Sequence, residues 1–255
     1  MTRRCSIART AAILMVCGLA AAGCGTGDYD RIVADRGKEL TYQTKFTVLY
    51  EAPTEVPESL FRIRIPQVFT NAFTTGSLDA TDNLPLGMVR LHPPFGVLPG
   101  YKVTYEALAE TQPRHQVPYY CYLAAGPSNK DAPMEAQLLA MIKALPNAPA
   151  AWEPVACDTP EYAKNEADRK KIAWKRITVK WDQAFDVVEG QRDTRKLPGT
   201  LDLWLYEGGG GYLIVGWRWP TEAEGKVAVA EFPAVTAGTL SVVEAPPADA
   251  APPAQ

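Results

Sequence analysis

Few residues in this chain have the type and spacing that catalysis or metal binding requires. His92 and His115 both lie close to prolines, in stretches that we expect to be loops. The sequence has no His-x-x-x-His, Cys-x-x-Cys or Gly-x-Ser-x-Gly pattern, so the common zinc and α/β-hydrolase signatures are missing. We therefore predict no catalytic residue, no metal and no cofactor. A catalytic triad assembled from distant residues stays open, because triads are spatial.

Three other motifs, two of charged residues and one of glycines, fit surface or turn positions better than binding sites. Asp79 and Asp82 miss the alternating ligand spacing of a calcium loop. The charged residues of 158–171 interleave in sign as on a solvated helix face. The glycines of 208–211 stand between two apolar stretches with no Lys-Ser/Thr after them, so they predict a hairpin turn rather than a phosphate loop.

The first 23 residues have the order of an export signal. Three arginines precede an apolar stretch over 11–22, which is shorter than the ~18 residues that span a bilayer. The segment ends in "AAGC" at Cys24, which resembles the lipobox of bacterial lipoproteins, where the signal is cut before the cysteine and the thiol carries diacylglycerol. We predict a signal peptide over 1–23 and lipidation of Cys24. An ordinary secretory signal with a chance cysteine, or twin-arginine export, is the alternative.

Removing this signal takes the formal charge from −3 to −6, because three arginines leave and no acid does. A mildly acidic chain has no electrostatic footprint for nucleic acid, so we predict no such partner. Charge would not hold the protein on anionic lipid either, so the acyl chains must be the membrane anchor. The expected location is a bacterial cell envelope, on the periplasmic or outer side of a membrane.

Cys121 and Cys157 remain as a pair in an exported chain, where disulfides persist. A bridge between them would close a loop of about 36 residues and stabilise the fold by roughly 4 kcal/mol. The stretch "YYCYLAA" around Cys121 also has the composition of a core strand. Two separately buried thiols are therefore the alternative.

Composition divides the mature chain into an arm, one domain and a tail. Residues 24–50 combine a short Gly-Thr-Gly tether with spaced apolar positions among charges, which predicts a lipidated tether and helical arm. Residues 55–243 are long enough for one sizeable core and contain no internal repeat. Residues 244–255 are rich in proline and alanine without apolar periodicity, which predicts a disordered tail.

Within the domain, apolar periodicity predicts strands and one helix. Residues 60–66 and 173–181 alternate as strands, and 101–110 and 117–126 are expected to form a hairpin. Residues 131–147 have helical spacing. This order favours an α+β fold with a mainly antiparallel sheet flanked by helices.

The stretch 201–219 predicts a hairpin that is apolar on both faces. Pairing Glu207 with Tyr212 separates its side chains into two sets. One face holds Leu201, Leu203, Leu205, Ile214 and Gly216. The other holds Trp204, Tyr206, Leu213, Val215, Trp217 and Trp219. A sheet with one solvent-exposed face would alternate apolar and polar residues along its strands. Because this hairpin is apolar on both faces, we expect helices to cover both of them.

The chain resembles two groups of proteins. The lipobox, the arm beginning "DYDRIV" and the strands "FRIRIP" and "YLIVGWRWP" together resemble lipoproteins of planctomycete bacteria that have no assigned activity. The order of elements, with a last segment "AEFPAVTAGTLSVVE" packing back, is also similar to that of PsbP-like domains. That likeness implies an α/β/α sandwich that acts as a binding or assembly factor. Residues 70–99 have no counterpart in it.

We therefore predict a lipid-anchored, non-catalytic binding or assembly module for an envelope protein. The alternative is a carbohydrate-binding module or carbohydrate-active enzyme that uses Trp204, Trp217 and Trp219 on one hairpin face, because aromatic faces stack on sugars. Exposed rings beside a carboxylate would favour the alternative. Burial of the rings would remove the observation on which the carbohydrate alternative rests.

Overall fold

The computed structural model describes residues 26–74, 99–226 and 229–243 of the chain. Some predictions fall outside these residues, namely those on the signal peptide, Cys24, Asp79, Asp82, His92 and the tail over 244–255. The described part is an α+β fold with mostly antiparallel sheets and few helices, as the sequence predicts.

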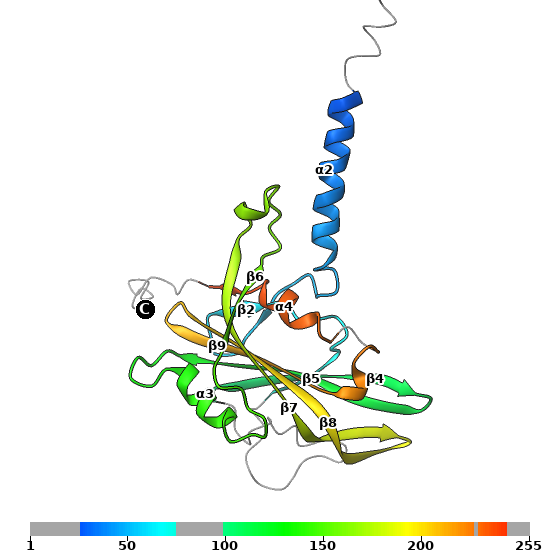
Figure 1. Ribbon diagram of the computed structural model, residues 1–255, viewed down its shortest axis with the longest axis vertical. Coiled ribbons are helices and arrows are strands. Elements are labelled where there is room, and N and C mark those ends of the chain that lie inside the picture. Colours follow the sequence, from blue (N-terminus) through cyan, green and yellow to red (C-terminus); the bar gives the residue numbers. More distant parts are fainter. Residues whose placement is uncertain (1–25, 75–98, 227–228, 244–255) are drawn as a thin grey trace, which may run out of the picture.

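The main sheet of the described residues has seven strands in the order β3-β4-β5-β9-β8-β7-β6, and all neighbours are antiparallel (Figure 1). The strands are β3 Asn71–Thr74, β4 Tyr101–Gln112, β5 His115–Pro127, β6 Glu153–Asp158, β7 Lys171–Glu189, β8 Gln191–Gly208 and β9 Gly211–Pro220. The long strands β7, β8 and β9 form a meander, and the predicted hairpin over 101–126 is β4–β5.

The predicted register of the β8–β9 hairpin is confirmed. Glu207 pairs with Tyr212, and the turn glycines Gly209 and Gly210 have φ angles of +62° and +79°, which favour glycine. The two predicted sets of apolar side chains lie in two separate core clusters, one on each face of the sheet. Alternation along the strands therefore decides which core each side chain joins.

The sheet also closes on itself at one end, which the sequence does not predict. β5 pairs with β9 from Tyr120 onward, but at Gln116 it pairs directly with Val188 of β7. Since β9 ends at Pro220 while the β7–β8 hairpin continues beyond it, the tip of that hairpin reaches back to β5. This contact protects strand edges that an open sheet would leave unpaired.

A single described helix, α3 (Met134–Ile142), covers one face of the meander. Its buried side chains Met134, Leu138 and Ile142 belong to the same core cluster as the leucines of β8. Asp131 and Pro146 of the predicted helix lie beyond its ends. The expected helical cover is therefore correct for this face.

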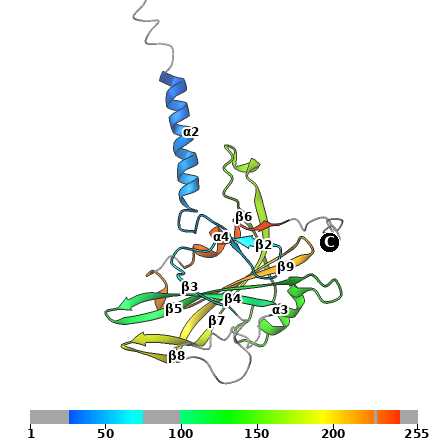
Figure 2. The same ribbon diagram turned by 180° about the vertical axis from the view of Figure 1, so that it is seen from behind.

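The other face is covered differently from the expected helix layer. A small second sheet lies over it together with a short helix, α4 (Figure 2). These elements are β1 Thr54–Glu55, β2 Phe61–Ile63, β10 Ser241–Val242 and α4 Phe232–Ala237. The domain also contains two short 3₁₀ turns, η2 Glu166–Asp168 and η3 Thr221–Ala223. The charged stretch 158–171 accordingly forms part of β6, a loop and η2 rather than a long helix.

Helix α2 (Thr26–Thr44) precedes the domain and extends away from it (Figure 1). Its 19 residues correspond to about 28 Å of helix. Contact with the domain is made along its C-terminal half and just beyond it, where Asp35 pairs with Lys164 and where Tyr42 and Phe46 pack with Tyr162 and Val235.

Replacing Leu138 with alanine should lower the free energy of unfolding by about 2–5 kcal/mol, because this fully buried side chain fills the space between α3 and the sheet. Lys143→Ala, at the exposed end of the same helix, is the control and should change stability by under about 0.5 kcal/mol. Urea denaturation followed by circular dichroism measures both values. Equal effects would contradict the packing of α3 on the sheet.

Candidate functional site

A cavity of about 450 Å³ opens on the tryptophan-bearing face of the sheet. Its polar lining consists of Arg176, Thr178 and Lys180 from β7, Thr200 from β8, Trp219 from β9, Glu224 after η3 and Glu231 just before α4. The three β7 residues share one face because side chains alternate along a strand. We call this the β7–β9 cavity.

The floor beside this cavity contains a fully buried carboxylate, Asp202 of β8. Arg176 donates from Nε to Oδ1 at 2.8 Å and from Nη2 to Oδ2 at 3.1 Å. The Thr178 hydroxyl donates to Oδ1 at 2.9 Å, and the Trp204 indole donates to Oδ2 at 3.0 Å. A buried carboxylate without such donors would be strongly destabilising. The hydrogen bond to Asp202 in turn raises the pKa of the Arg176 guanidinium.

A second carboxylate, Glu224, joins the outer wall of the cavity to the sheet. Its Oε1 accepts a hydrogen bond from the Trp219 indole at 3.2 Å and another from the Thr200 hydroxyl at 3.4 Å. The Lys180 ammonium lies 3.9 Å away. These contacts fix the chain that follows η3 against β8 and β9.

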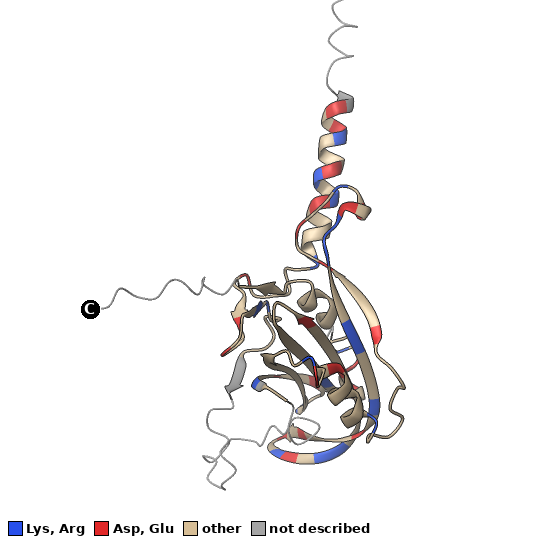
Figure 3. Cartoon of the chain, turned by 90° about the vertical axis from the view of Figure 1, so that its left-hand side faces the viewer, with Lys and Arg blue, Asp and Glu red and all other residues tan. Residues whose placement is uncertain are grey.

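The β7–β9 cavity thus presents both signs of charge. The Lys180 side chain is 68% exposed, and its long contact to Glu224 leaves the ammonium accessible to a ligand. Arg176 stays 35% exposed while it holds Asp202. Positive residues are spaced along β7 in Figure 3. Groups of this kind bind polar or charged partners through ion pairs and hydrogen bonds.

A second polar cluster lies on the opposite face, where β4, β5 and β9 run side by side. Glu106 is 2% exposed, and burial raises the pKa of its carboxyl, against the opposing effect of Arg192 at 3.3 Å. Its Oε1 has no hydrogen-bond partner in the described part of the chain. Glu106, Tyr120 and Arg218 lie side by side across β4, β5 and β9. The Arg218 guanidinium lies 5.7 Å from the centre of the Tyr120 ring and 4.5 Å from that of Phe185.

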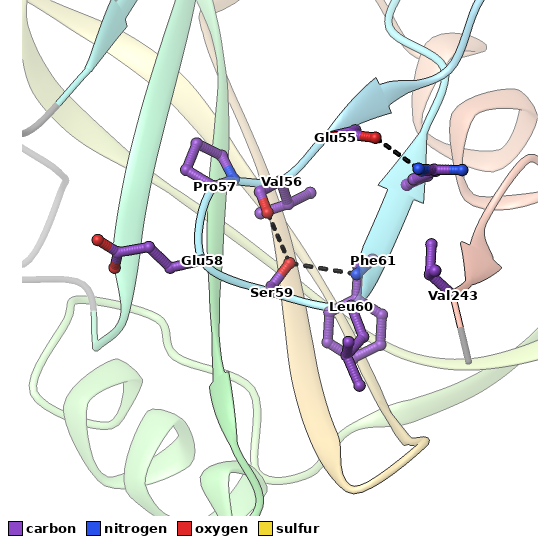
Figure 4. Close-up of a pocket in the computed structure, with 9 residues that line it drawn as sticks. Glu55, Val56, Pro57, Glu58, Ser59, Leu60, Phe61 and Val243 are labelled. Carbon is purple, nitrogen blue, oxygen red and sulfur yellow. Dashed lines mark hydrogen bonds and ion pairs between the residues drawn. The ribbon is translucent and has the colours of Figure 1, made fainter. Parts of the chain in front are cut away.

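Another hollow, of about 410 Å³, lies at the β1–β2 turn (Figure 4). The Ser59 hydroxyl donates to the Val56 carbonyl at 2.8 Å and accepts from the Phe61 amide at 3.2 Å. Glu55 pairs with Arg62 at 2.5 Å. Glu58, also in its lining, pairs with Lys102 of β4 at 2.6 Å. The polar side chains of this hollow are therefore engaged within the fold, and we place the candidate site in the β7–β9 cavity.

The three tryptophans predicted as a possible binding face are buried. Trp204, Trp217 and Trp219 share one face as expected, but they are 2%, 2% and 5% exposed. Phe69 and Phe232 pack on Trp217, with ring centroids 5.9 and 6.4 Å apart. Trp219 alone of the three lines the β7–β9 cavity. The three rings therefore do not form an open platform.

The possible disulfide between Cys121 and Cys157 is not formed, and both are free, buried thiols. Cys121 lies in β5 and Cys157 in β6, with β9, β8 and β7 between these two strands. That separation exceeds the ~7 Å between Cα atoms that a bridge allows. Burial raises the pKa of the Cys157 thiol to about 11 and that of Cys121 well above its ordinary value.

His115 is the first residue of β5 rather than a loop residue. Its Nε2 lies 3.4 Å from Glu222, and its Nδ1 lies 3.9 Å from Glu189. Neither His115 nor these two partners line the β7–β9 cavity. Among the described residues, no cluster of three or more histidine, cysteine or carboxylate side chains could hold a metal ion.

The main residues missed by the sequence analysis are Asp202 and Arg176. A signal for Asp202 was present, because it shares the parity of Trp204 in "LDLWLY" and so lies on a face expected to be apolar. An acid on such a face needs a charged partner. The identity of that partner depends on the β7–β8 register, which the sequence pattern alone does not determine.

No protein-family model matches the chain, and a search of curated proteins finds no relative. No helix within the described ranges is both long and apolar enough to cross a membrane.

Replacing Asp202 with alanine should lower the free energy of unfolding by about 3–5 kcal/mol, because the Arg176 guanidinium loses its buried partner. The double variant Arg176→Met, Asp202→Leu should recover part of this loss, since no unpaired charge remains. Chemical denaturation gives the free energy of unfolding of the wild type, the single variant and the double variant. Glu189→Ala, which removes an exposed ion pair with Arg195, is the matched control and should have little effect. A single Asp202 variant as stable as the wild type would contradict the buried network.

The raised pKa of Glu106 predicts an opposite pH dependence from that of an ion-paired surface carboxylate. Between the ordinary value of about 4.3 and the raised folded value, the folded state keeps a proton that the unfolded state has lost. Its contribution to stability is therefore present at low pH and is lost as pH rises through this window. Wild type should lose stability relative to Glu106→Gln from about pH 4 upward, in urea titrations at a series of pH values. Glu110→Gln, on an exposed position of β4, should not show this divergence.

Proposed function

We propose that this protein is a lipid-anchored binding or assembly module of a bacterial cell envelope, held by Cys24 and directed at an envelope protein partner. The observation that carries the proposal is the β7–β9 cavity, where exposed Lys180 and Glu224 and partly exposed Arg176 surround a buried, hydrogen-bonded carboxylate. Charged side chains at the rim of a preformed cavity suit recognition of a polar protein surface. The "AAGC" sequence supports the anchor.

A PsbP-like domain is the finer fold that we propose within the α+β architecture. It is supported by a central antiparallel sheet that is covered on both faces, and by a last segment over 232–242 that packs back on it. The short second sheet in place of a helix layer is a departure from a simple α/β/α sandwich. Fold likeness alone does not carry function, so the proposal rests on the cavity.

The carbohydrate-binding alternative loses the observation that motivated it, because Trp204, Trp217 and Trp219 are buried among other rings. Sugar stacking needs an exposed aromatic face. We therefore retain a protein partner as the proposed ligand.

A photoreactive phenylalanine analogue at position 180, introduced in living cells, should crosslink one recurrent envelope protein. The same analogue at Lys130, an exposed lysine outside the cavity lining, is the matched control and should give several-fold less of that product. The product should also decrease in Cys24→Ala, because the tether no longer concentrates the module at the membrane. Mass spectrometry identifies the products. Glycan fragments at position 180 in place of a protein would favour the carbohydrate reading, and equal crosslinking at both positions would contradict a role for the cavity.

A further inference from the structure

Helix α2 has an apolar strip that none of the described residues covers. Tyr29, Ile32, Val33 and Leu40 are 66%, 63%, 51% and 51% exposed. At about 100° per residue, Tyr29, Val33 and Leu40 fall within about 40° of one another, and Ile32 lies about 60° from Tyr29. These four side chains form one strip along the helix, which we call the α2 stripe.

The domain holds α2 by the opposite side of the helix. Tyr42, about 220° around the helix from Tyr29, is buried beside Tyr162 with ring centroids 5.5 Å apart. Asp35, at about 240°, pairs with Lys164 at 2.5 Å. The α2 stripe therefore points away from the domain, and most of the helix stands clear of it (Figure 2).

We propose that the α2 stripe lies on the lipid bilayer that receives the acyl chains of Cys24, an inference that rests on the proposed lipid anchor. α2 begins at Thr26, only two residues after Cys24, which keeps the start of the helix within about 7 Å of the anchored residue. An apolar strip facing the acyl boundary, with polar side chains toward water, is the arrangement of interfacial helices. Tyr29, the stripe residue next to the anchor, has an amphipathic ring of the kind enriched at membrane interfaces.

The charges of α2 are balanced, which limits the type of membrane contact. The helix sequence has four acidic and three basic residues, and both signs are distributed along it (Figure 3). Attraction to anionic headgroups therefore adds little, and contact should depend on the apolar side chains and vary little with salt. We therefore expect the α2 stripe to contact a bilayer of neutral, zwitterionic lipid without any anionic lipid.

A second copy of the chain fits the α2 stripe less well. Four side chains are far fewer than the roughly 20–30 residues a side of a standard protein interface. Arg36 also lies on the strip between Val33 and Leu40, and it pairs with Glu39 at 2.5 Å. In a helix–helix contact this charge would be buried, whereas on a bilayer the long side chain can reach the headgroup level.

The test uses the full mature protein, produced with its own signal, purified from membranes and reconstituted in phosphatidylcholine vesicles. A fluorescent label is attached to Val33→Cys on the stripe or, as the matched control, to Lys38→Cys about 140° away on the same helix. Cys121 and Cys157 do not compete for the label, since both thiols are buried and have raised pKa values. Brominated lipids should quench the label at 33 at least about threefold more than at 38, because only the stripe enters the interface.

Each other outcome overturns the inference in a distinguishable way. Equally weak quenching at 33 and 38, with acyl chains found on Cys24 by mass spectrometry, means that α2 stands free while the anchor is real. Energy transfer between labels at 33 on two chains, without lipid quenching, assigns the stripe to a second copy. A Cys24 that carries no acyl chain refutes the proposed anchor, and the inference with it. Changing Ile32 and Leu40 to glutamine should remove the difference between the two labels if the stripe makes the contact.

Discussion

The β8–β9 hairpin is buried on both faces over most of 199–220, and each of these faces has to be kept from water. This constraint explains why segments far apart in the sequence meet over one sheet. α3 covers the leucine face, while 54–63 and 232–242 come together over the tryptophan face. β1 and β10 have two residues each and β2 has three, too few to be stable alone. Their structure therefore depends on the surface that they cover.

Asp202 makes the same meander specific as well as stable. A slip of one residue between β7 and β8 would turn Arg176 and Thr178 to the other face and leave the buried carboxylate with only the Trp204 indole. The network thus penalises wrong registers more than it stabilises the correct one, since a buried ion pair gains little over apolar packing. Its donors at Arg176 and Thr178 also line the β7–β9 cavity, so the residues that hold the register also shape the site.

Alternating side chains made much of the fold predictable from the sequence. The β8–β9 register, the two-faced core and the α3 helix follow from local periodicity, because each involves residues close in the chain. The contact of β5 with β7, the tiny second sheet and the separation of Cys121 from Cys157 do not, because they depend on the path of distant strands. The candidate site was missed for the same reason. Its residues come from three strands and the turn after η3, and only tertiary structure brings them together.

The arm and the cavity are connected through one stretch of chain, which sets the orientation of the site relative to α2. α2 is joined to the β6–β7 region by Tyr42 against Tyr162 and by Lys45, whose ammonium lies 3.0 Å from Asp158. β7 then runs from that region directly to Arg176 and Lys180 at the cavity. A helix fixed at its C-terminal end transmits its orientation to the sheet, so on the proposed membrane contact the α2 stripe would also determine the direction in which the cavity points. A tethered module with a defined orientation meets a membrane partner at a higher effective concentration than one that tumbles on a flexible linker.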